Sequence, residues 1–294
     1  MPNTVHTTRI AAPPEAVHAL IADVTVWPLM FEPNIHTEYV GGAPRTEGRE
    51  RIRIWAFAGS EIRSWTSERV LDPHALTVDF RQEEPAAPLT SMSGRWLAKD
   101  IGGGETLLEL HHEFEAFTDE HFVLHALHQN SPAELAGMRI AAENPRTPYV
   151  FEDSLRIEAP PRAVYDFLYA ADRWPERLPH VASLDLSEPA PGIQRMVMET
   201  RSPDGTLHSS ESVRVCRAEV GSIAYKQIRT PTVLVAHTGE WRLTPLPDGT
   251  TLATSRHSVI LADPKVREAV RGALGANSRA TLRRAKEFTE TRRS

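Results

Sequence analysis

Two segments of the chain carry the side chains best suited to chemistry. The first, residues 61–71, places at alternate positions Arg63, Trp65, Ser67 and Arg69. The second, residues 106–114, carries His112 among alternating leucines. Side chains of a strand alternate between faces, so each series would share one face of a sheet. Arginine presents planar cationic donors to carbonyl or enolate oxygens, and a neutral imidazole can take and give a proton near pH 7.

The aromatic and charged side chains of these faces predict one interior pocket. Its expected members are Trp65, Arg69, Trp96 and His112, with Trp27 and Asn130 near the mouth. Tryptophan walls would bind a flat or coiled apolar substrate and exclude water. Each residue type also has a simpler interpretation: a strand tryptophan is as often plain core, a strand arginine is more often solvated, and a histidine on an apolar face is usually structural.

Composition and charge exclude several classes of function. A net charge of -6 and a pI of about 6.1 argue against nucleic acid as the main partner, because binding phosphates needs clustered Lys and Arg. The single cysteine, Cys216, excludes an internal disulfide framework and fits a reducing cytoplasm. His111 and His112 would point to opposite faces of a strand, so we expect no metal site. No apolar run approaches the roughly 20 residues of a membrane helix, and residues 1–6 lack a signal pattern; we expect a cytoplasmic protein that does not contact a membrane.

The chain contains an internal duplication. Residues 9–28 match residues 156–175 without a gap, and both copies carry Ala-Pro-Pro and Trp-Pro steps. The residues that correspond to Arg69, Trp96, His112 and Asn130 in the second copy are Arg214, Trp241, His257 and Asn277. A period this long indicates two domains, which we place at residues 1–146 and 147–294.

Hydrophobic spacing and turn residues predict the same order of elements in each copy: strand, helix, antiparallel strands and a long helix. In the first copy we expect a helix that opens at Ala12-Pro13-Pro14 and ends at Trp27-Pro28, and a last helix over 119–143 with an interruption near 130–132. The expected strands span 5–10, 50–57, 61–71, 76–81, 94–98 and 106–114.

In the second copy, Pro203-Asp204-Gly205 predicts a hairpin turn and residues 278–291 the last helix. An antiparallel sheet must bury one face against the helix that crosses it. When such a sheet curls, a cavity opens between sheet and helix, and cavities of this kind are ligand sites.

The ordered set of motifs resembles a known family. The motifs that carry the likeness are Ala12-Pro13-Pro14, the Val24–Pro28 segment, the Trp65–Arg69 strand, Trp96 and Asn130-Ser131. With these residues the chain resembles the di-domain polyketide aromatase/cyclases of bacterial type II (aromatic) polyketide pathways, in the START-like helix-grip superfamily. The resemblance implies an α+β fold of two tandem helix-grip (START/Bet v-like) domains, each a curved antiparallel sheet wrapped around a long C-terminal helix with an interior cavity.

The resemblance also implies an activity. Members take a poly-β-ketone held by thioester on an acyl carrier protein, direct the first-ring aldol closure and promote dehydration to an aromatic ring, without metal or nucleotide cofactor. Two-domain members act after a ketoreductase of the type II polyketide synthase and close C7–C12 of a C9-reduced chain. By this resemblance Arg69 anchors or polarises a carbonyl, Trp27, Trp65 and Trp96 shape the pocket, and His112 transfers protons. Arg69→Ala is then expected to abolish correct ring closure while the fold survives.

The two copies differ at one of these positions, because Ser210 stands in the second copy where the first has Trp65. We therefore expect the main cyclisation site in the first domain. The second domain could bind part of the chain through Arg214, Trp241, His257 and Asn277, finish the aromatisation, or only stabilise the fold. A basic patch near Arg51 and Arg53, or on the arginine-rich C-terminal tail, could meet an acidic carrier protein.

Three other functions remain open from the sequence. The first is a non-catalytic carrier of a hydrophobic small molecule, although a carrier has less need of inward Arg and His side chains. The second is another enzyme of the superfamily, such as a dehydratase or hydrolase acting on a hydrophobic ligand. The third is an interaction scaffold that uses only its outer surfaces.

Overall fold

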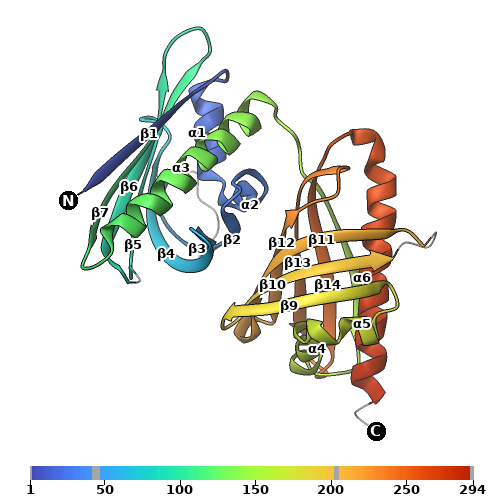
Figure 1. The fold of residues 1–294 in the computed structure, drawn as a ribbon. Coiled ribbons are helices and arrows are strands. Elements are labelled where there is room, and N and C mark those ends of the chain that lie inside the picture. Colours follow the sequence, from blue (N-terminus) through green and yellow to red (C-terminus); the bar gives the residue numbers. More distant parts are fainter. Residues whose placement is uncertain (1, 42–46, 86, 202–204, 292–294) are drawn as a thin grey trace. The chain divides into compact units, whose positions relative to one another are not determined.

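The computed structural model describes residues 2–41, 47–85, 87–201 and 205–291. The chain divides into two compact units, Met1–Arg146 and Thr147–Ser294, and each has its own sheet and its own long final helix (Figure 1). Two residues of the predicted hairpin turn, Pro203 and Asp204, lie outside the described residues.

The first unit is a seven-stranded antiparallel sheet that curls around its last helix (Figure 1). Its strands are β1 (Asn3–Ile10), β2 (Asn34–Tyr39), β3 (Gly48–Ala58), β4 (Glu61–Asp72), β5 (Thr77–Gln82), β6 (Leu89–Asp100) and β7 (Thr106–Ala116). Its helices are α1 (Pro14–Ala22), α2 (Trp27–Met30) and α3 (Glu120–Glu143). The strand order β1-β7-β6-β5-β4-β3-β2 makes a meander whose first strand lies beside its last.

The second unit repeats this topology. Its strands are β8 (Tyr149–Ile157), β9 (Val181–Ala190), β10 (Ile193–Arg201), β11 (Leu207–Arg217), β12 (Ser222–Arg229), β13 (Leu234–Pro245) and β14 (Thr251–Leu261). Its helices are α4 (Pro161–Tyr169), α5 (Trp174–Arg177) and α6 (Arg267–Glu290). The strand order β8-β14-β13-β12-β11-β10-β9 has the same form. Both units therefore have the predicted α+β helix-grip architecture.

Proline sets where the first helices begin. Pro13 is extended, and Pro14 takes the first helical position of α1, where its missing N–H would have had no partner in any case. The prediction that Trp27-Pro28 ends this helical segment is wrong, because α1 already ends at Ala22 and Trp27-Pro28 begins α2. A proline in the second position of a helix starts it for the same reason that Pro14 does.

The predicted interruption of the last helix is also wrong. α3 runs without a break from Glu120 to Glu143 and carries Pro132 in its interior. An interior proline costs about 3 kcal/mol relative to alanine. The helix persists because Leu135 and Met138, both buried, pack into the core of the unit, and most helical stability comes from such packing.

Each final helix is tethered to the start of its unit in the same way. The carboxylate of Glu143, the last residue of α3, accepts a hydrogen bond from the backbone N–H of Ala11 at 3.0 Å. Glu290, the last residue of α6, accepts one from the backbone N–H of Glu158 at 2.7 Å. The tethers hold the helix across the curled sheet, which positions the residues described next.

Candidate active site

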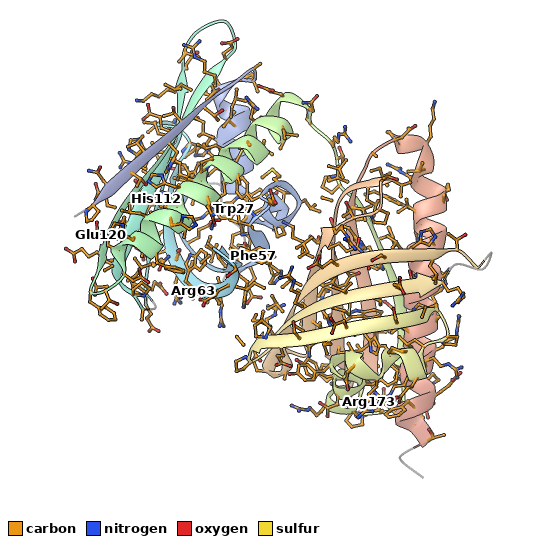
Figure 2. The ribbon with its side chains drawn as sticks, viewed as in Figure 1. Trp27, Phe57, Arg63, His112, Glu120 and Arg173 are labelled. Carbon is orange, nitrogen blue, oxygen red and sulfur yellow. The ribbon has the colours of Figure 1, made fainter. Side chains whose placement is uncertain are left out.

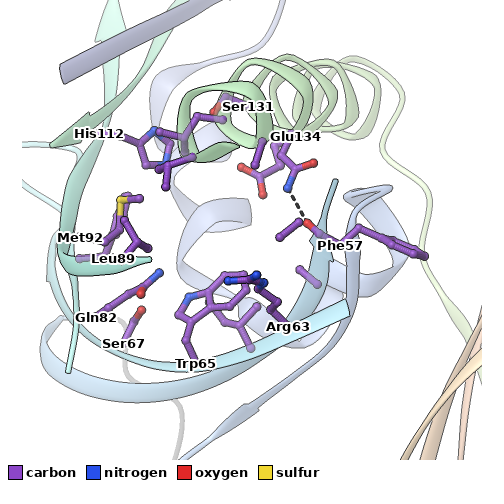
Figure 3. Close-up of a pocket in the computed structure, with 18 of the residues that line it drawn as sticks. Phe57, Arg63, Trp65, Ser67, Gln82, Leu89, Met92, His112, Ser131 and Glu134 are labelled. Carbon is purple, nitrogen blue, oxygen red and sulfur yellow. Dashed lines mark hydrogen bonds between the residues drawn. The ribbon is translucent and has the colours of Figure 1, made fainter. Parts of the chain in front are cut away.

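A cavity of about 190 Å³ lies in the first unit between the inner face of the sheet and α3 (Figure 3). Its walls come from β3 to β7, from α2 and from α3 between Phe122 and Glu134. Most of the lining side chains are apolar, and the aromatic ones include Trp27, Phe31, Trp65, Phe80 and Trp96. A mostly apolar cavity with a few polar groups is the usual form of a small-molecule site.

The alternation along β4 points one row of side chains into this cavity. Arg63, Trp65, Ser67 and Arg69 all line it, as a period of two requires. The row runs from half-buried Arg63 to Arg69, which is only 1% exposed. At the usual rise of a strand this row is roughly 20 Å long. The predicted set of Trp65, Arg69, Trp96 and His112 is thus brought together around one cavity.

Arg69 lines the cavity but is bonded mainly to its own chain. Its Nε donates to Glu50 Oε1 at 2.9 Å, and its Nη2 donates to the same carboxylate and to Ala22 O. Its Nη1 donates to Ile21 O at 2.9 Å, and Trp27 lies 5.1 Å from the guanidinium. At most one of the five guanidinium N–H groups is left for a ligand, so Arg69 ties α1 to the sheet whatever else it does.

His112, unlike Arg69, has a ring nitrogen to which no described residue bonds. It is 9% exposed, it meets the ring of Phe80 edge-on at 5.5 Å, and no described residue bonds to its Nδ1. Burial lowers the pKa of His112 to about 3, so its imidazole is neutral near pH 7. Its neighbour His111 bonds Glu109 at 2.8 Å on the other face of β7. A neutral imidazole with a vacant nitrogen is free to bond a ligand.

Three polar residues of α3 face the cavity, and only one of them was predicted. Asn130 donates to Phe57 O on β3 at 2.6 Å. Ser131 and Glu134 follow on the same side of the helix (Figure 3). Glu134 is half-buried, and burial raises the pKa of its carboxyl to about 8. The spacing of 130, 131 and 134 places all three on one helical face, a signal that the sequence analysis did not use beyond Asn130.

Arg63 joins three segments at one end of the cavity. Its Nη2 donates to Glu61 at 2.9 Å, its Nη1 donates to Ala87 O at 2.7 Å, and its guanidinium stacks 5.0 Å from the ring of Phe122. These partners lie at the start of β4, just before β6 and in the first turn of α3. Glu61 is exposed, and we call this end of the cavity its mouth.

Two tryptophans lie at the other end. Trp27 was expected near the mouth, but it is 7% exposed and packs on Arg69 and on Phe31, whose ring is 5.4 Å away. The ring of Trp96 also stacks on Phe31, with the ring centres 6.1 Å apart. Trp27 thus lies at the Arg69 end of the row rather than near the mouth where it was expected, because α2 packs against β2 and α3.

The second unit keeps the buried arginine but changes its partner. Arg214 stands in the same register as Arg69, yet the residue across the strand pair is Gln194 rather than Glu50. Arg214 Nη2 donates to Leu168 O at 2.6 Å, its guanidinium stacks 5.2 Å from Trp174, and no described residue bonds to its Nη1. A carboxylate partner is thus replaced by a neutral amide.

The second unit also surrounds its histidine with bonding partners. His257 Nδ1 lies 3.0 Å from His237 Nε2 and 3.1 Å from the hydroxyl of Tyr225, and its Nε2 lies 2.7 Å from Ser278 Oγ. Burial lowers the pKa of His257 to about 4. Both ring nitrogens of His257 are engaged, whereas Nδ1 of His112 is not.

The other predicted residues of the second unit, Trp241 and Asn277, lie in its core and on its last helix. Trp241 is buried in the core of its unit. Asn277 is half-buried on α6, and its backbone carbonyl accepts from Thr281 Oγ1 at 3.0 Å. Trp241 and the Arg214–Trp174 pair belong to one packed core, with Asn277 on the helix that covers it.

Three surface and composition features bear on partners. Arg51 is paired with Glu83, while Arg53 donates to Ser64 and stacks on Trp55. Within the described ranges no group of three or more His, Cys, Asp or Glu side chains is arranged to hold a metal ion. Among the helices that the structure describes, none has both the length and the apolar composition to cross a membrane.

A family model described as "Polyketide cyclase / dehydrase and lipid transport" matches this chain twice, over residues 1–143 and 149–289. Curated relatives match nearly the whole chain. The bifunctional cyclase/dehydratase of the granaticin polyketide synthase of Streptomyces violaceoruber is 40% identical over 97% of this chain and 93% of its own length. The corresponding protein of the actinorhodin polyketide synthase of Streptomyces coelicolor is 38% identical over 96% of this chain and 95% of its own length.

Among solved structures, the di-domain ARO/CYC BexL from the BE-7585A biosynthetic pathway is similar over 99% of both chains, with 39% identity and a TM-score of 0.83. The di-domain ARO/CYC StfQ from the steffimycin pathway is similar over 98% of this chain and 99% of its own, with 33% identity and a TM-score of 0.80.

Proposed function

The chain belongs to the polyketide cyclase/dehydrase family, and on that premise we propose that it is an aromatase/cyclase that closes the first ring of a poly-β-ketone by an aldol step and dehydrates it to an aromatic ring. The regiochemistry we assign is C7–C12 closure of a C9-reduced chain. The substrate is carried on the acyl carrier protein of a type II polyketide synthase and arrives after a ketoreductase.

One observation supports this proposal above the others: an aromatic cavity in the first domain encloses an imidazole with a vacant nitrogen. Because His112 is neutral, it can accept the proton from a carbon flanked by two ketones. The same low pKa makes this imidazole a weak base, so its action depends on being held close to the acidic carbon of the substrate. Trp65, Trp96 and Phe31 form the walls against which the chain folds, and Asn130 fixes α3 above them.

Arg69 is assigned the closed end of the cavity. Its charge is shared with Glu50, and the N–H that remains on Nη1 can hold one carbonyl oxygen of the chain. Trp27 beside it limits how far the chain enters. The role of Arg69 is then to stop and orient the substrate, and proton transfer belongs to other groups.

The second domain, residues 147–294, is assigned a supporting role. Its histidine is held by His237, Tyr225 and Ser278, so breaking those bonds would precede any proton transfer to a substrate. Arg214, Trp241 and Asn277 are assigned to the packing of that domain. Residues 1–146 form the domain that binds the polyketide.

One alternative retains support. A non-catalytic carrier of a hydrophobic molecule would also need an apolar cavity, and the bonding of Arg69 to its own chain is what such a carrier would show. The carrier would leave its ligand unchanged, so product analysis separates the two functions.

The test is reconstitution of a minimal aromatic polyketide synthase with a ketoreductase, with and without this protein, followed by mass spectrometry and NMR of the products. We expect a new aromatic first-ring product that depends on the protein. His112→Gln should lower its formation by about a hundredfold, within the usual range for loss of a general base. The matched control is His111→Gln, on the opposite face of the same strand. An unchanged product mixture with folded protein would instead favour the carrier.

A further inference from the structure

The dehydration step needs a proton donor for the departing hydroxyl, and the proposed function leaves that role vacant. We infer that Glu134 of α3 is this general acid. The inference rests on the proposed function, because it assigns a group to one of its two steps.

The placement of Glu134 is the first argument. Figure 3 shows its carboxyl directed into the cavity from α3, with the imidazole of His112 directed into the same space from β7. Asn130, one helical turn earlier, is bonded to Phe57 O at 2.6 Å and so fixes this part of the helix against β3. The carboxyl is therefore carried on a helix held in position, as a positioned acid requires.

The two arginines that line the cavity are bonded to residues other than Glu134. The titratable or cationic side chains that share the cavity are Arg63, Arg69 and His112. Arg63 is bonded to Glu61 and Ala87 O, and Arg69 to Glu50 and α1. In the described part of the chain none of the three forms a hydrogen bond or ion pair with Glu134.

The histidines on two elements that pack on α3 are bonded to groups other than Glu134. On β1, which packs on α3, His6 bonds His128 at 3.2 Å. On α1, His18 lies 3.2 Å from Thr77 O. The half-buried Glu134 carboxyl lines an apolar cavity, and no described cation is bonded to it. Such surroundings favour the protonated form of a carboxylic acid, which can donate.

The second domain provides an internal comparison. Thr281 occupies the helical position that corresponds to Glu134, and its hydroxyl donates to Asn277 O at 3.0 Å. The carboxyl is present in the domain whose histidine has a vacant nitrogen and absent from the domain whose histidine is fully bonded. The two groups therefore occur together, as an acid and base that serve one reaction would.

The chemistry balances with these two groups. After ring closure the new ring carries a hydroxyl on the carbon β to a ketone and a hydrogen on the α carbon between them. His112 takes the α proton, and the C–H electron pair becomes the new C=C bond. The C–O bond breaks as Glu134 gives its proton to the oxygen, and water leaves. Imidazolium and carboxylate then neutralise each other by proton transfer, which restores both groups without oxidant or cofactor.

The variant that tests this is Glu134→Gln, which keeps the shape and a hydrogen-bond donor but cannot release a proton. In the reconstituted system we expect ring closure to continue and the cyclic alcohol, heavier than the aromatic product by one water, to accumulate. The rate of dehydration should fall about a hundredfold or more, as for other general acids. The control is Glu120→Gln, an exposed carboxyl at the start of the same helix (Figure 2).

The pH profile gives a readout that a merely structural role would not alter. The carboxyl has a pKa of about 8, so dehydration by the wild-type protein should decline as the pH rises through 8. Glu134→Gln should lack this decline. If substitution by glutamine unfolds the protein, Glu134→Ala with added acetate replaces it, and acetate should restore dehydration in that variant alone.

The inference is overturned if Glu134→Gln dehydrates the ring at the wild-type rate, or if it keeps the alkaline decline. It is also overturned if folded Glu134→Ala shows no response to acetate while ring closure continues. The proposed function fails in a different way, through the absence of any ring product that depends on the wild-type protein.

Discussion

At the scale of single residues, the buried arginine that the two domains share has different bonding partners in each domain. Arg69 and Arg214 are each 1% exposed and each stack on the tryptophan of the Trp-Pro step. The cation of Arg69 is paired with the carboxylate of Glu50, whereas Arg214 has Gln194 opposite it in the strand pair and donates to the backbone carbonyl of Leu168. Removing a partner from a buried ion pair leaves an uncompensated charge, so the two positions should respond differently to substitution.

Arg69→Ala is expected to cost about 3–5 kcal/mol of unfolding free energy, because it leaves the buried Glu50 carboxylate without its cation. The earlier expectation that the fold survives this change unharmed is therefore replaced by one of marked destabilisation. Arg214→Ala should cost less, and the double variant Glu50→Gln, Arg69→Met should recover part of the loss. Urea denaturation followed by circular dichroism measures all three.

The control for that series is Arg95→Ala, which breaks an exposed ion pair with Asp79 and should cost under about 1 kcal/mol. Equal losses for Arg69→Ala and Arg95→Ala would show that the buried pair is not a structural determinant. Arg69 would then be available for the polarising role that the sequence suggested.

At the scale of elements, the site depends on how three segments meet at the mouth of the cavity. Arg63 bonds Glu61 at the start of β4 and the carbonyl of Ala87 just before β6, and it stacks on the ring of Phe122 in α3. Arg63 therefore holds these segments together by an ion pair, a hydrogen bond to a carbonyl and a cation–π contact. We propose that the substrate enters at this end, so the rigidity of the mouth should affect entry.

Arg63→Ala should increase amide hydrogen exchange at the start of α3 and at the start of β6 by about fivefold to tenfold, because a charge-assisted hydrogen bond and a cation–π contact are lost. Exchange in the centre of β7 should not change. The matched control is Arg53→Ala, which also removes an arginine stacked on an aromatic ring but lies on β3 with its side chain bonded to Ser64. An equal increase in amide hydrogen exchange in both variants would show that Arg63 does not hold these segments in place.

At the scale of the whole molecule, the two domains share one fold but differ in the polar groups of their interiors. The first domain combines His112 and Glu134 with apolar neighbours such as Met92 and Leu110. At the positions that match Met92 and Leu110, the second domain has His237 and Ser255. Both of these side chains bond to His257. A polar network whose members bond one another rigidifies a core, so this domain is suited to support.

The buried histidines should make stability depend on pH. Burial lowers the folded-state pKa of His257 to about 4, below the unfolded value of 6.5, so the unfolded chain binds the proton first. The stabilisation is complete above pH 6.5 and is lost as the pH falls from there toward 4. Between pH 7 and 5 this should amount to about 2 kcal/mol for such a histidine.

His257→Gln should therefore reduce the acid-induced loss of stability, measured by urea denaturation at pH 5, 6 and 7, and should leave the ratio of ring products unchanged. His111→Gln, which changes a half-buried surface histidine, serves as the control. A change in the ratio of ring products with His257→Gln would show that the second domain takes part in catalysis.

The sequence alone determined the duplication, because the chain matches itself, and it determined the inward row on β4 and the side of β7 that carries His112, because these follow from the period of two along a strand. It missed β2 (Asn34–Tyr39) and predicted the last helix of the second domain from Ser278, whereas α6 begins at Arg267. The pairing of Arg69 with Glu50, the inward position of Trp27 and the vacancy at His112 came only from tertiary structure. They depend on strand register, on the fold of α2 and on which side chains meet across the sheet. Glu134 belongs to the same group: its spacing is legible in the chain, but only the cavity turns an ordinary helical glutamate into a protonated acid.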